Sequence, residues 1–296
     1  MGFRTVCIES RCRCSYSGGY LVVTAEDRTT KIHLSEISMV IFSTTKVYLS
    51  AFLLSELAKA KIPAVFSDEK SFPVAQSLPL YGAHNCPARL ASQLEWSVPT
   101  KKRVWQKVVR DKIRAQSEVL EEFGFMAEAK RLREYAVETL SGDTTNREAA
   151  AAGLYFSTLF GQDFNRDQNT DLNASLNYGY SILLSKVCRE IVARGYETQM
   201  GIFHRGELNQ WNLACDLMEP FRPYVDWLVV TSGFSSFNSD MKHYLLNMMN
   251  LTLRYDEGEY KVGSVVSAYI QDCFDALNRK VASEDIKMYV MRYGED

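Results

Sequence analysis

The stretch Lys101-Lys-Arg-Val-Trp-Gln-Lys-Val-Val-Arg-Asp-Lys-Ile-Arg114 decides the fold class of the part of the chain around it. Side chains suited to a buried face recur in it every three or four residues, and the recurrence continues beyond it. The members of this seam are Trp105, Val109, Ile113, Gln116 and Leu120. Such spacing is typical of one face of an α-helix. The sequence therefore predicts a helix that buries a Trp/Val/Ile seam.

Basic residues occupy the opposite face of the same predicted helix. They lie at the i, i+4, i+7 and i+11 positions and are Arg103, Lys107, Arg110 and Arg114. The seam lies about 200° away around the helix axis, so the prediction is a basic ridge turned outward. Two interpretations of the ridge stay open. It is an ordinary solvated face, or it binds DNA phosphates if a phosphodiester site lies nearby.

Helical spacing begins near Arg89 and continues through the rest of the chain. A glycine directly after Arg194, Gly195, predicts a helix end there. The predicted helices are Arg89–Ser97, Lys101–Glu122, Met126–Thr139, Arg147–Phe160, Ser175–Arg194, Leu213–Val230, Asp240–Leu253 and Ser264–Leu277.

The first seventy residues have a different pattern, with short runs rich in Val, Ile, Tyr and Thr between turn residues. One predicted helix, Leu49–Lys61, interrupts them. Cys12 and Cys14 also share one face of a predicted strand. The other predicted strands are Phe3–Glu9, Tyr20–Ala25, Lys31–Leu34, Met39–Phe42 and Ile62–Phe66.

Three prolines and a glycine break the pattern between residues 71 and 88. The stretch is too apolar for a free linker, so we expect a linker that packs on a surface. The predicted fold class is therefore α+β. A small β-rich, sandwich-like domain with one helix (residues 1–70) and the linker (71–88) precede a larger all-α domain (89–296) that carries the candidate site.

The composition is that of a soluble globular protein, with 46% hydrophobic and 24% charged residues. No apolar run approaches the roughly 18 residues of a membrane span. The first seven residues lack the apolar core of a signal peptide. We therefore expect a cytoplasmic protein with no membrane partner. The net charge of −2 excludes a globally basic, histone-like DNA binder.

The seven cysteines form an odd and scattered set. Cys12 and Cys14 have no second Cys or His pair at zinc-site spacing. We expect reduced, structural thiols.

The residues best suited to catalysis or metal binding lie in the predicted helical domain. His204 stands in the glycine-bracketed segment Gly201-Ile-Phe-His-Arg-Gly206, and two carboxylates, Asp216 and Glu219, follow it. Glu148, in another predicted helix, adds a further carboxylate. One imidazole nitrogen with carboxylate oxygens suits Mn²⁺ or Mg²⁺ better than a metal that prefers thiolates. Such an ion can promote attack on a phosphodiester.

Each of these residues also has a purely structural interpretation. His204 can be a hydrogen-bonded turn residue beside Phe203. Glu148 follows Thr145 by three residues, which is the capping-box spacing, and the pattern alone favours this cap. Asp216 and Glu219 would lie about 60° apart on a helix, although the prolines at 220 and 223 disfavour a continuous helix there.

Four segments together resemble the CRISPR spacer-acquisition integrase, the first of the numbered CRISPR-associated (Cas) proteins, in its type II form. The order of a β-rich head, a linker and a helical body resembles this family too. The four segments are Asn146-Arg-Glu-Ala-Ala-Ala-Ala-Gly-Leu-Tyr-Phe156, Leu176-Asn-Tyr-Gly-Tyr180, Gly201-Ile-Phe-His204 and Asp216-Leu-Met-Glu-Pro-Phe-Arg-Pro223.

This resemblance implies that Glu148, His204 and Glu219 are the catalytic and metal-binding residues, with Asp216 as a supporting acid. It also implies a homodimer formed through the β-rich heads. The implied partners are the small second numbered Cas protein, double-stranded DNA as prespacer and CRISPR repeat, and other type II CRISPR proteins. The implied cofactor is Mg²⁺ or Mn²⁺.

The reaction implied by the resemblance is a transesterification in which a prespacer 3′-hydroxyl attacks a repeat strand, with water as the nucleophile in DNA cutting. Two other functions stay open. One is a metal-dependent nuclease without integrase activity. The other is a non-enzymatic DNA-binding regulator, although the sequence contains no convincing helix-turn-helix pattern.

Overall fold

The computed structural model describes residues 4–26, 28–69, 73–77, 79–80 and 85–291. The chain divides into two compact units. Residues 1–89 and the segment Cys188–Tyr196 form the first, and residues 90–187 and 197–296 form the second. The predicted domain boundaries, at residues 70 and 88, stay a prediction. Part of the predicted linker lies outside the described residues.

The first unit contains a mixed sheet with the strand order β1-β5-β7-β8. Its central strand β5 is nearly all buried, as expected for an apolar run in the middle of a sheet. β1 and β7 both run parallel to β5, and β8 pairs antiparallel with β7 at one edge. The bounds are β1 Arg4–Ile8, β5 Ile37–Phe42, β7 Ala64–Ser67 and β8 Pro73–Ser77.

A second sheet in this unit has the order β4-β3-β2-β6. β2, β3 and β4 form an antiparallel meander, and β6 runs parallel to β2. The bounds are β2 Cys12–Ser17, β3 Tyr20–Ala25, β4 Arg28–His33 and β6 Val47–Leu49, with the 3₁₀ turn η1 at Leu34–Glu36 and the helix α1 at Ala51–Lys59.

Both sheets and α1 contribute to one hydrophobic core, so the prediction of a β-rich head with one helix is confirmed. Members of this core are Val6, Ile8, Cys12, Cys14, Leu21, Val40, Phe42, Leu53 and Leu57. Burial, reinforced by the neighbouring Cys12, raises the pKa of Cys14 to about 12, which keeps its thiol protonated. The sequence analysis did not predict β6, or β8 within the expected linker.

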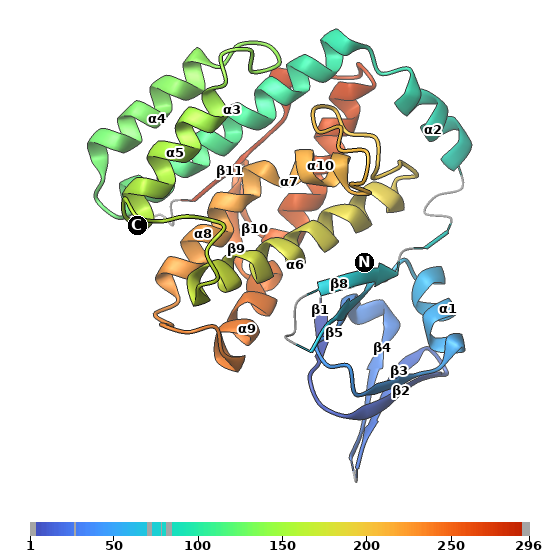
Figure 1. Cartoon of the computed structure of the whole chain (residues 1–296). Helices are drawn as coiled ribbons and strands as arrows, with labels where there is room; N and C mark the ends of the chain where they lie inside the picture. Colours follow the sequence, from blue (N-terminus) through green and yellow to red (C-terminus); the bar gives the residue numbers. More distant parts are fainter. Residues whose placement is uncertain (1–3, 27, 70–72, 78, 81–84, 292–296) are drawn as a thin grey trace. The chain divides into compact units, whose positions relative to one another are not determined.

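The second unit is mainly helical, and its long helix α3 lies side by side with α4 and α5 (Figure 1). α6 contributes its last residues to the first unit. The helices are α2 Cys86–Leu94, α3 Val98–Glu122, α4 Met126–Glu138, α5 Arg147–Phe160, α6 Asp171–Ala193, α7 Asn212–Met218, α8 Arg222–Thr231, α9 Ser239–Leu246 and α10 Val262–Leu277, with 3₁₀ turns η2 Glu219–Phe221, η3 Asn247–Asn250 and η4 Ser283–Asp285. In the described part of the chain, no helix combines the length and apolar character that a membrane crossing requires.

The seam predicted on α3 is confirmed, because all five of its members are buried. Gly195 has a φ of 83°, a conformation suited to glycine, and it follows the end of α6 as predicted. A small antiparallel sheet of order β10-β9-β11 was not expected. The predicted helix Asp240–Leu253 instead ends at Leu246, and the chain turns into this sheet. The bounds are β9 Thr252–Tyr255, β10 Gly258–Lys261 and β11 Tyr289–Val290.

Gly179 allows α8 to approach α6 closely. A Cβ atom at this position would lie 2.5 Å from Cγ1 of Val225, which is well inside van der Waals contact. Gly153 of α5 offers the opposite case, because nothing lies within 4 Å of a Cβ built there. The glycine in the Leu176–Tyr180 segment is therefore required by packing.

We expect Gly179→Ala to destabilise the protein by about 1–3 kcal/mol, since the added methyl group overpacks the contact with Val225. Gly153→Ala is the matched control. It should stabilise the protein by about 0.5–1 kcal/mol, because alanine loses less backbone entropy in a helix. Urea unfolding monitored by circular dichroism measures both. Equal stability of the two variants would contradict the packing argument.

Candidate active site

The buried carboxylate of Asp216 fixes the loop that carries His204. Its Oδ2 accepts the backbone N–H groups of Ile202 at 2.6 Å and Phe203 at 3.0 Å, and its Oδ1 accepts that of His204 at 3.1 Å. The loop closes so tightly that a Cβ at Gly201 would lie 2.3 Å from the carbonyl oxygen of His204. Asp216, at the middle of α7, thus determines the backbone path of the loop.

The same carboxylate orients the imidazole of His204. Nδ1 lies 2.6 Å from Oδ1 of Asp216, so Nδ1–H donates and Nε2 is left as the acceptor of the neutral ring. The ring packs edge-on against Trp105 and Phe203, with centroids 5.9 and 5.5 Å away. The hydrogen bond to Asp216 raises the pKa of His204 above its ordinary value, and partial burial opposes this shift. The sequence-based alternative, a hydrogen-bonded turn histidine, correctly describes the role of Nδ1. It does not involve Nε2, which can still accept a ligand.

Glu148 is not part of a capping box, so that sequence-based interpretation was wrong. Asp143 caps the start of α5 instead: Oδ1 accepts the N–H of Arg147 at 2.8 Å and Oδ2 that of Glu148 at 3.0 Å. The Glu148 side chain therefore does not cap the helix. Its Oε1 accepts a hydrogen bond from Nζ of Lys112 at 2.7 Å.

Glu219 lies at the start of η2, and its side chain is buried. Its Oε2 lies 2.5 Å from Nζ of Lys112, and its Oε1 accepts a hydrogen bond from Nη1 of Arg222 at 2.9 Å. Burial alone would raise the pKa of Glu219. The charges of Lys112 and Arg222 outweigh it and lower the pKa to about 2, so the carboxylate is ionised at neutral pH.

Lys112 was missed by the sequence analysis, although its position in the sequence contains a signal. It follows Trp105 by seven residues and therefore lies almost on the seam face of α3, where a lysine needs a buried partner. Burial alone would lower the pKa of Lys112, but the carboxylates of Glu219 and Glu148 raise it. A charged ammonium thus bridges these two carboxylates.

Glu148, Glu219 and His204 therefore converge on one region of the second unit. The charges of both glutamates also contribute to the raised pKa of His204, which is consistent with their proximity. Among the described residues, no three His, Cys, Asp or Glu side chains lie close enough together to hold a metal ion. The ammonium of Lys112 lies at the point that the two carboxylates share.

The predicted basic ridge of α3 is only partly exposed, and the prediction is wrong for Lys107. Its Nζ is buried and lies 2.6 Å from Oδ2 of Asp111, itself fully buried. Arg110 donates a hydrogen bond from Nη2 to the carbonyl of Thr139 at 3.1 Å. Arg103 and Arg114 remain exposed. The periodicity correctly placed these side chains on one side of the helix. It did not reveal that other elements cover more than one face of α3.

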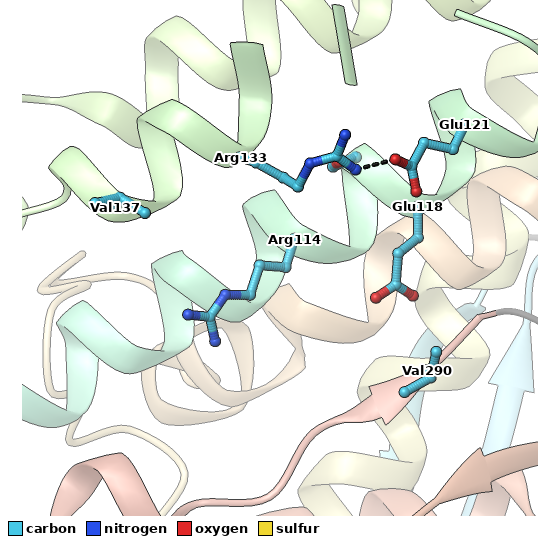
Figure 2. Close-up of a pocket in the computed structure, with 7 residues that line it drawn as sticks. Arg114, Glu118, Glu121, Arg133, Val137 and Val290 are labelled. Atoms are coloured by element: carbon cyan, nitrogen blue, oxygen red, sulfur yellow. Dashed lines mark hydrogen bonds and ion pairs between the residues drawn. The ribbon is translucent and has the colours of Figure 1, made fainter. Parts of the chain in front are cut away.

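Arg114 lines a hollow that also contains acidic side chains (Figure 2). Glu118 and Glu121 come from α3, and Arg133 comes from α4. Arg133 forms an ion pair with Glu121, as the dashed line in Figure 2 marks. Oε2 of Glu118 accepts the N–H of Met291 at 2.7 Å. This mixed charge makes the hollow a poor site for a phosphate group.

The sequence matches the family described as CRISPR associated protein Cas1 over residues 6–247. The CRISPR-associated endonuclease Cas1 of Neisseria meningitidis serogroup C (strain 8013) is 40% identical over 230 residues, which are 78% of this chain and 76% of that protein.

Structures with a similar fold have been solved. A casposase bound to integration product has a TM-score of 0.75 at 16% identity, and the match covers 100% of this chain and 96% of that chain. A Cas6-RT-Cas1–Cas2 complex also has a TM-score of 0.75 at 16% identity, with 98% of this chain and 36% of that chain covered.

Asp216→Asn should lower the pKa of His204, because the amide removes the negative charge that favours the imidazolium. A raised histidine pKa stabilises the fold fully below the unfolded-state value, and this contribution is lost as pH rises through the folded-state value. The variant should therefore lose that part of the pH dependence of stability.

NMR titration of the imidazole carbon-bound protons measures this shift, and the small number of histidines simplifies assignment. The resonances of His33 and His243 provide the internal control. An unchanged pKa of His204 in Asp216→Asn would show that the contact with Asp216 does not control its protonation.

Proposed function

The chain belongs to the Cas1 family of CRISPR-associated proteins, and on this premise we propose that it is a divalent-metal-dependent DNA integrase and endonuclease of CRISPR adaptation. The observation that carries the proposal is the convergence of Glu148 and Glu219 on one cation beside the oriented imidazole of His204. The name of the Neisseria relative, which is an endonuclease, and the integration product in the casposase structure support the same chemistry.

Glu148, His204 and Glu219 would hold the ion, and their donor set fits Mg²⁺ or Mn²⁺. Two carboxylates and one imidazole nitrogen are ligands that these ions accept. Glu219 is already ionised, and Asp216 keeps Nε2 of His204 as the acceptor. The point shared by the two carboxylates already accommodates a positive charge, that of Lys112.

A bound ion would supply Lewis-acid stabilisation of the charge that develops on the scissile phosphate. The 3′-oxygen of one DNA end then forms a bond to phosphorus, and the bond from phosphorus to the 3′-oxygen of the repeat strand breaks. With water as the attacking group the same exchange cuts DNA. Asp216 holds the imidazole, and Arg222 holds the carboxylate of Glu219, so that both groups are positioned before DNA arrives.

The partners follow from the family. They are double-stranded prespacer and repeat DNA, a second copy of this chain joined through the β-rich unit, and the small second numbered Cas protein. The Cas1–Cas2 complex among the similar structures supports this last partner. Other type II CRISPR proteins and a cytoplasmic location belong to the same proposal. Of the predicted ridge, Arg103, Arg110 and Arg114 remain candidates for DNA contacts, whereas the buried Lys107 does not.

Two alternatives differ in what the purified protein does to DNA. A metal-dependent nuclease without integrase activity would cut DNA but would not join it. A non-enzymatic DNA-binding regulator would bind DNA without either reaction. A strand-transfer assay with labelled 3′-hydroxyl DNA and a repeat-containing plasmid, in Mg²⁺ or Mn²⁺ and with the small partner added, separates the three.

Glu148→Gln, His204→Ala and Glu219→Gln should each reduce strand transfer by roughly a hundredfold or more, since each removes one ligand of the ion that stabilises the reacting phosphate. Glu122→Gln, an exposed acid at the end of α3, is the control and should retain activity. Circular dichroism checks that each variant folds. Wild-type joining by His204→Ala would contradict the site.

Lys112→Met should bind Mn²⁺ more tightly than the wild type, because the ammonium no longer competes for the two carboxylates. The metal-free variant should be less stable by about 3–5 kcal/mol, as when one partner of a buried ion pair is removed. Calorimetric titration with Mn²⁺ and thermal unfolding with and without Mn²⁺ measure the two effects.

Lys107→Met is the matched control, because Lys107 is also a buried lysine of α3 but pairs with Asp111 outside the site. It should lose stability, and Mn²⁺ should not restore that stability. Weaker Mn²⁺ binding by Lys112→Met than by the wild type would contradict the competition.

A further inference from the structure

The segment Leu176–Tyr180 brings an aromatic ring close to the candidate metal ligands. Its last residue, Tyr180, is buried and directly follows Gly179 on α6. α8 approaches α6 closely at this glycine, because a Cβ there would lie 2.5 Å from Cγ1 of Val225. The close approach lets the side chain of Tyr180 reach residues of α8.

Tyr180 contacts two residues of α8. Its hydroxyl donates a hydrogen bond to Oδ1 of Asp226. The guanidinium carbon of Arg222 lies 4.4 Å from the centroid of its ring. Arg222 and Asp226 are four residues apart, so their side chains lie on one face of the helix. The tyrosine therefore cannot move relative to this face without losing one of the two contacts.

The guanidinium of Arg222 depends on this ring. Its Nη1 donates a hydrogen bond to Oε1 of Glu219 at 2.9 Å. Its Nε is buried and, in the part of the chain that the structure describes, has no hydrogen-bond acceptor. A guanidinium is attracted to the negative face of an aromatic ring, and more strongly where water is excluded. The ring of Tyr180 thus adds a restraint that hydrogen bonds do not supply.

A second guanidinium contacts the same ring but is held independently. The Cζ of Arg166 lies 5.2 Å from the ring centroid of Tyr180. Its Nη1 and Nη2 donate hydrogen bonds to the side-chain oxygens of Asn173 at 2.9 Å and Asn177 at 2.5 Å. Two amides of α6 therefore fix Arg166, whereas Arg222 has the ring and one carboxylate oxygen.

Arg222 in turn determines which oxygen of Glu219 faces the shared cation position. Because Oε1 accepts the hydrogen bond from Arg222, Oε2 is the oxygen that lies 2.5 Å from Nζ of Lys112. The same ammonium pairs with Glu148. A fixed guanidinium therefore keeps Oε2 directed at the point that the two carboxylates share.

We propose that Tyr180 is a positioning residue of the candidate metal site. It holds the guanidinium of Arg222, and Arg222 directs Oε2 of Glu219 to the metal ion. Tyr180 acts through Arg222 and not through contact with the ion or with DNA. The role toward the ion rests on the proposed function, whereas the hold on Arg222 exists in the metal-free protein. This inference gives the Leu176–Tyr180 segment a part in the chemistry of the site.

The first measurement uses the full chain in EDTA, so that no metal ion contributes. NMR follows the Nε–H signal of Arg222, which is assigned by its loss in Arg222→Lys. The buried Nε–H should exchange slowly with solvent in the wild type. Tyr180→Leu should accelerate this exchange by roughly tenfold, because the ring no longer holds the guanidinium. Tyr180→Phe keeps the ring and should retain the slow exchange.

The second measurement is calorimetric titration with Mn²⁺ alone. Tyr180→Leu should weaken Mn²⁺ binding by roughly tenfold or more, as is usual when a residue that orients a metal ligand is lost. Tyr180→Phe should bind Mn²⁺ within about threefold of the wild type, because the cation–π contact remains. Circular dichroism checks folding, and Tyr180→Met replaces Tyr180→Leu if the leucine variant does not fold.

Tyr224→Leu is the matched control, because Tyr224 is also a buried tyrosine and lies on α8 itself. Its hydroxyl donates to the carbonyl of Met248 at 3.0 Å, and its ring stacks on Trp227. The variant should lose stability but keep both the Mn²⁺ affinity and the slow Nε–H exchange. Equal losses of Mn²⁺ affinity in Tyr180→Leu and Tyr224→Leu would mean general destabilisation and contradict the positioning role.

Two further outcomes separate this inference from the proposed function. If the wild type binds Mn²⁺ and joins DNA, but Tyr180→Leu matches it in Mn²⁺ affinity and in Nε–H exchange, the positioning role is wrong and the integrase proposal stands. If the wild type neither binds Mn²⁺ nor joins or cuts DNA, but Tyr180→Leu releases Arg222, the hold on Arg222 stands and the integrase proposal fails.

Discussion

The hydrogen bonds of one buried carboxylate, that of Asp216, hold the candidate site together. A buried carboxylate without partners costs several kcal/mol, and this one collects three backbone N–H groups and the imidazole Nδ1–H. The loop between α6 and α7 therefore has one low-energy path. That path sets the direction of Nε2 of His204 and the exposure of Phe203, so the candidate metal site depends on these four contacts.

The charges of the two candidate glutamate ligands are balanced by two cations. Glu148 and Glu219 contribute two negative charges, and Lys112 and Arg222 contribute two positive ones. The protein can therefore bury the two glutamates without first binding a metal ion. A divalent ion added to this balanced set leaves excess positive charge, and a DNA phosphate is the ligand that would neutralise it. On the proposed function, this arrangement would couple tight metal binding to the presence of DNA.

The sequence predicted the helices and central strands well, because their apolar spacing is regular. The prediction failed where contacts between different elements determine the burial of a side chain or the local structure. Periodicity placed Lys107 on the ridge, but the i, i+4 pair with Asp111 lets both side chains be buried. The β9–β11 sheet was missed because its strands are short and follow a helical segment.

The candidate residues of the site were named from their types and spacing and from the resemblance to the family, but the contacts among them were not predicted. Thr145 and Glu148 have the spacing of a cap, yet Asp143 provides it from outside that pattern. Lys112 contacts two glutamates that are far from it in the sequence. Asp216 likewise contacts both the backbone and the imidazole of the His204 loop, which precedes it by more than ten residues. No local pattern encodes such contacts.

The helix α3 links the aromatic contact with the His204 loop to the candidate metal site. Lys101, Trp105 and Lys112 follow one another at spacings of four and seven residues, so they lie within about 40° of one another around the helix axis. Trp105 lies about 6 Å along the axis from Lys101 and about 10 Å from Lys112. A basic side chain, the indole that stacks on Phe203 and the cation between the two glutamates thus project from one rigid stripe. A helix keeps these spacings constant, whereas a loop would not. On the proposed function, this constancy would hold the His204 loop and the two carboxylates in fixed positions around the reacting phosphate.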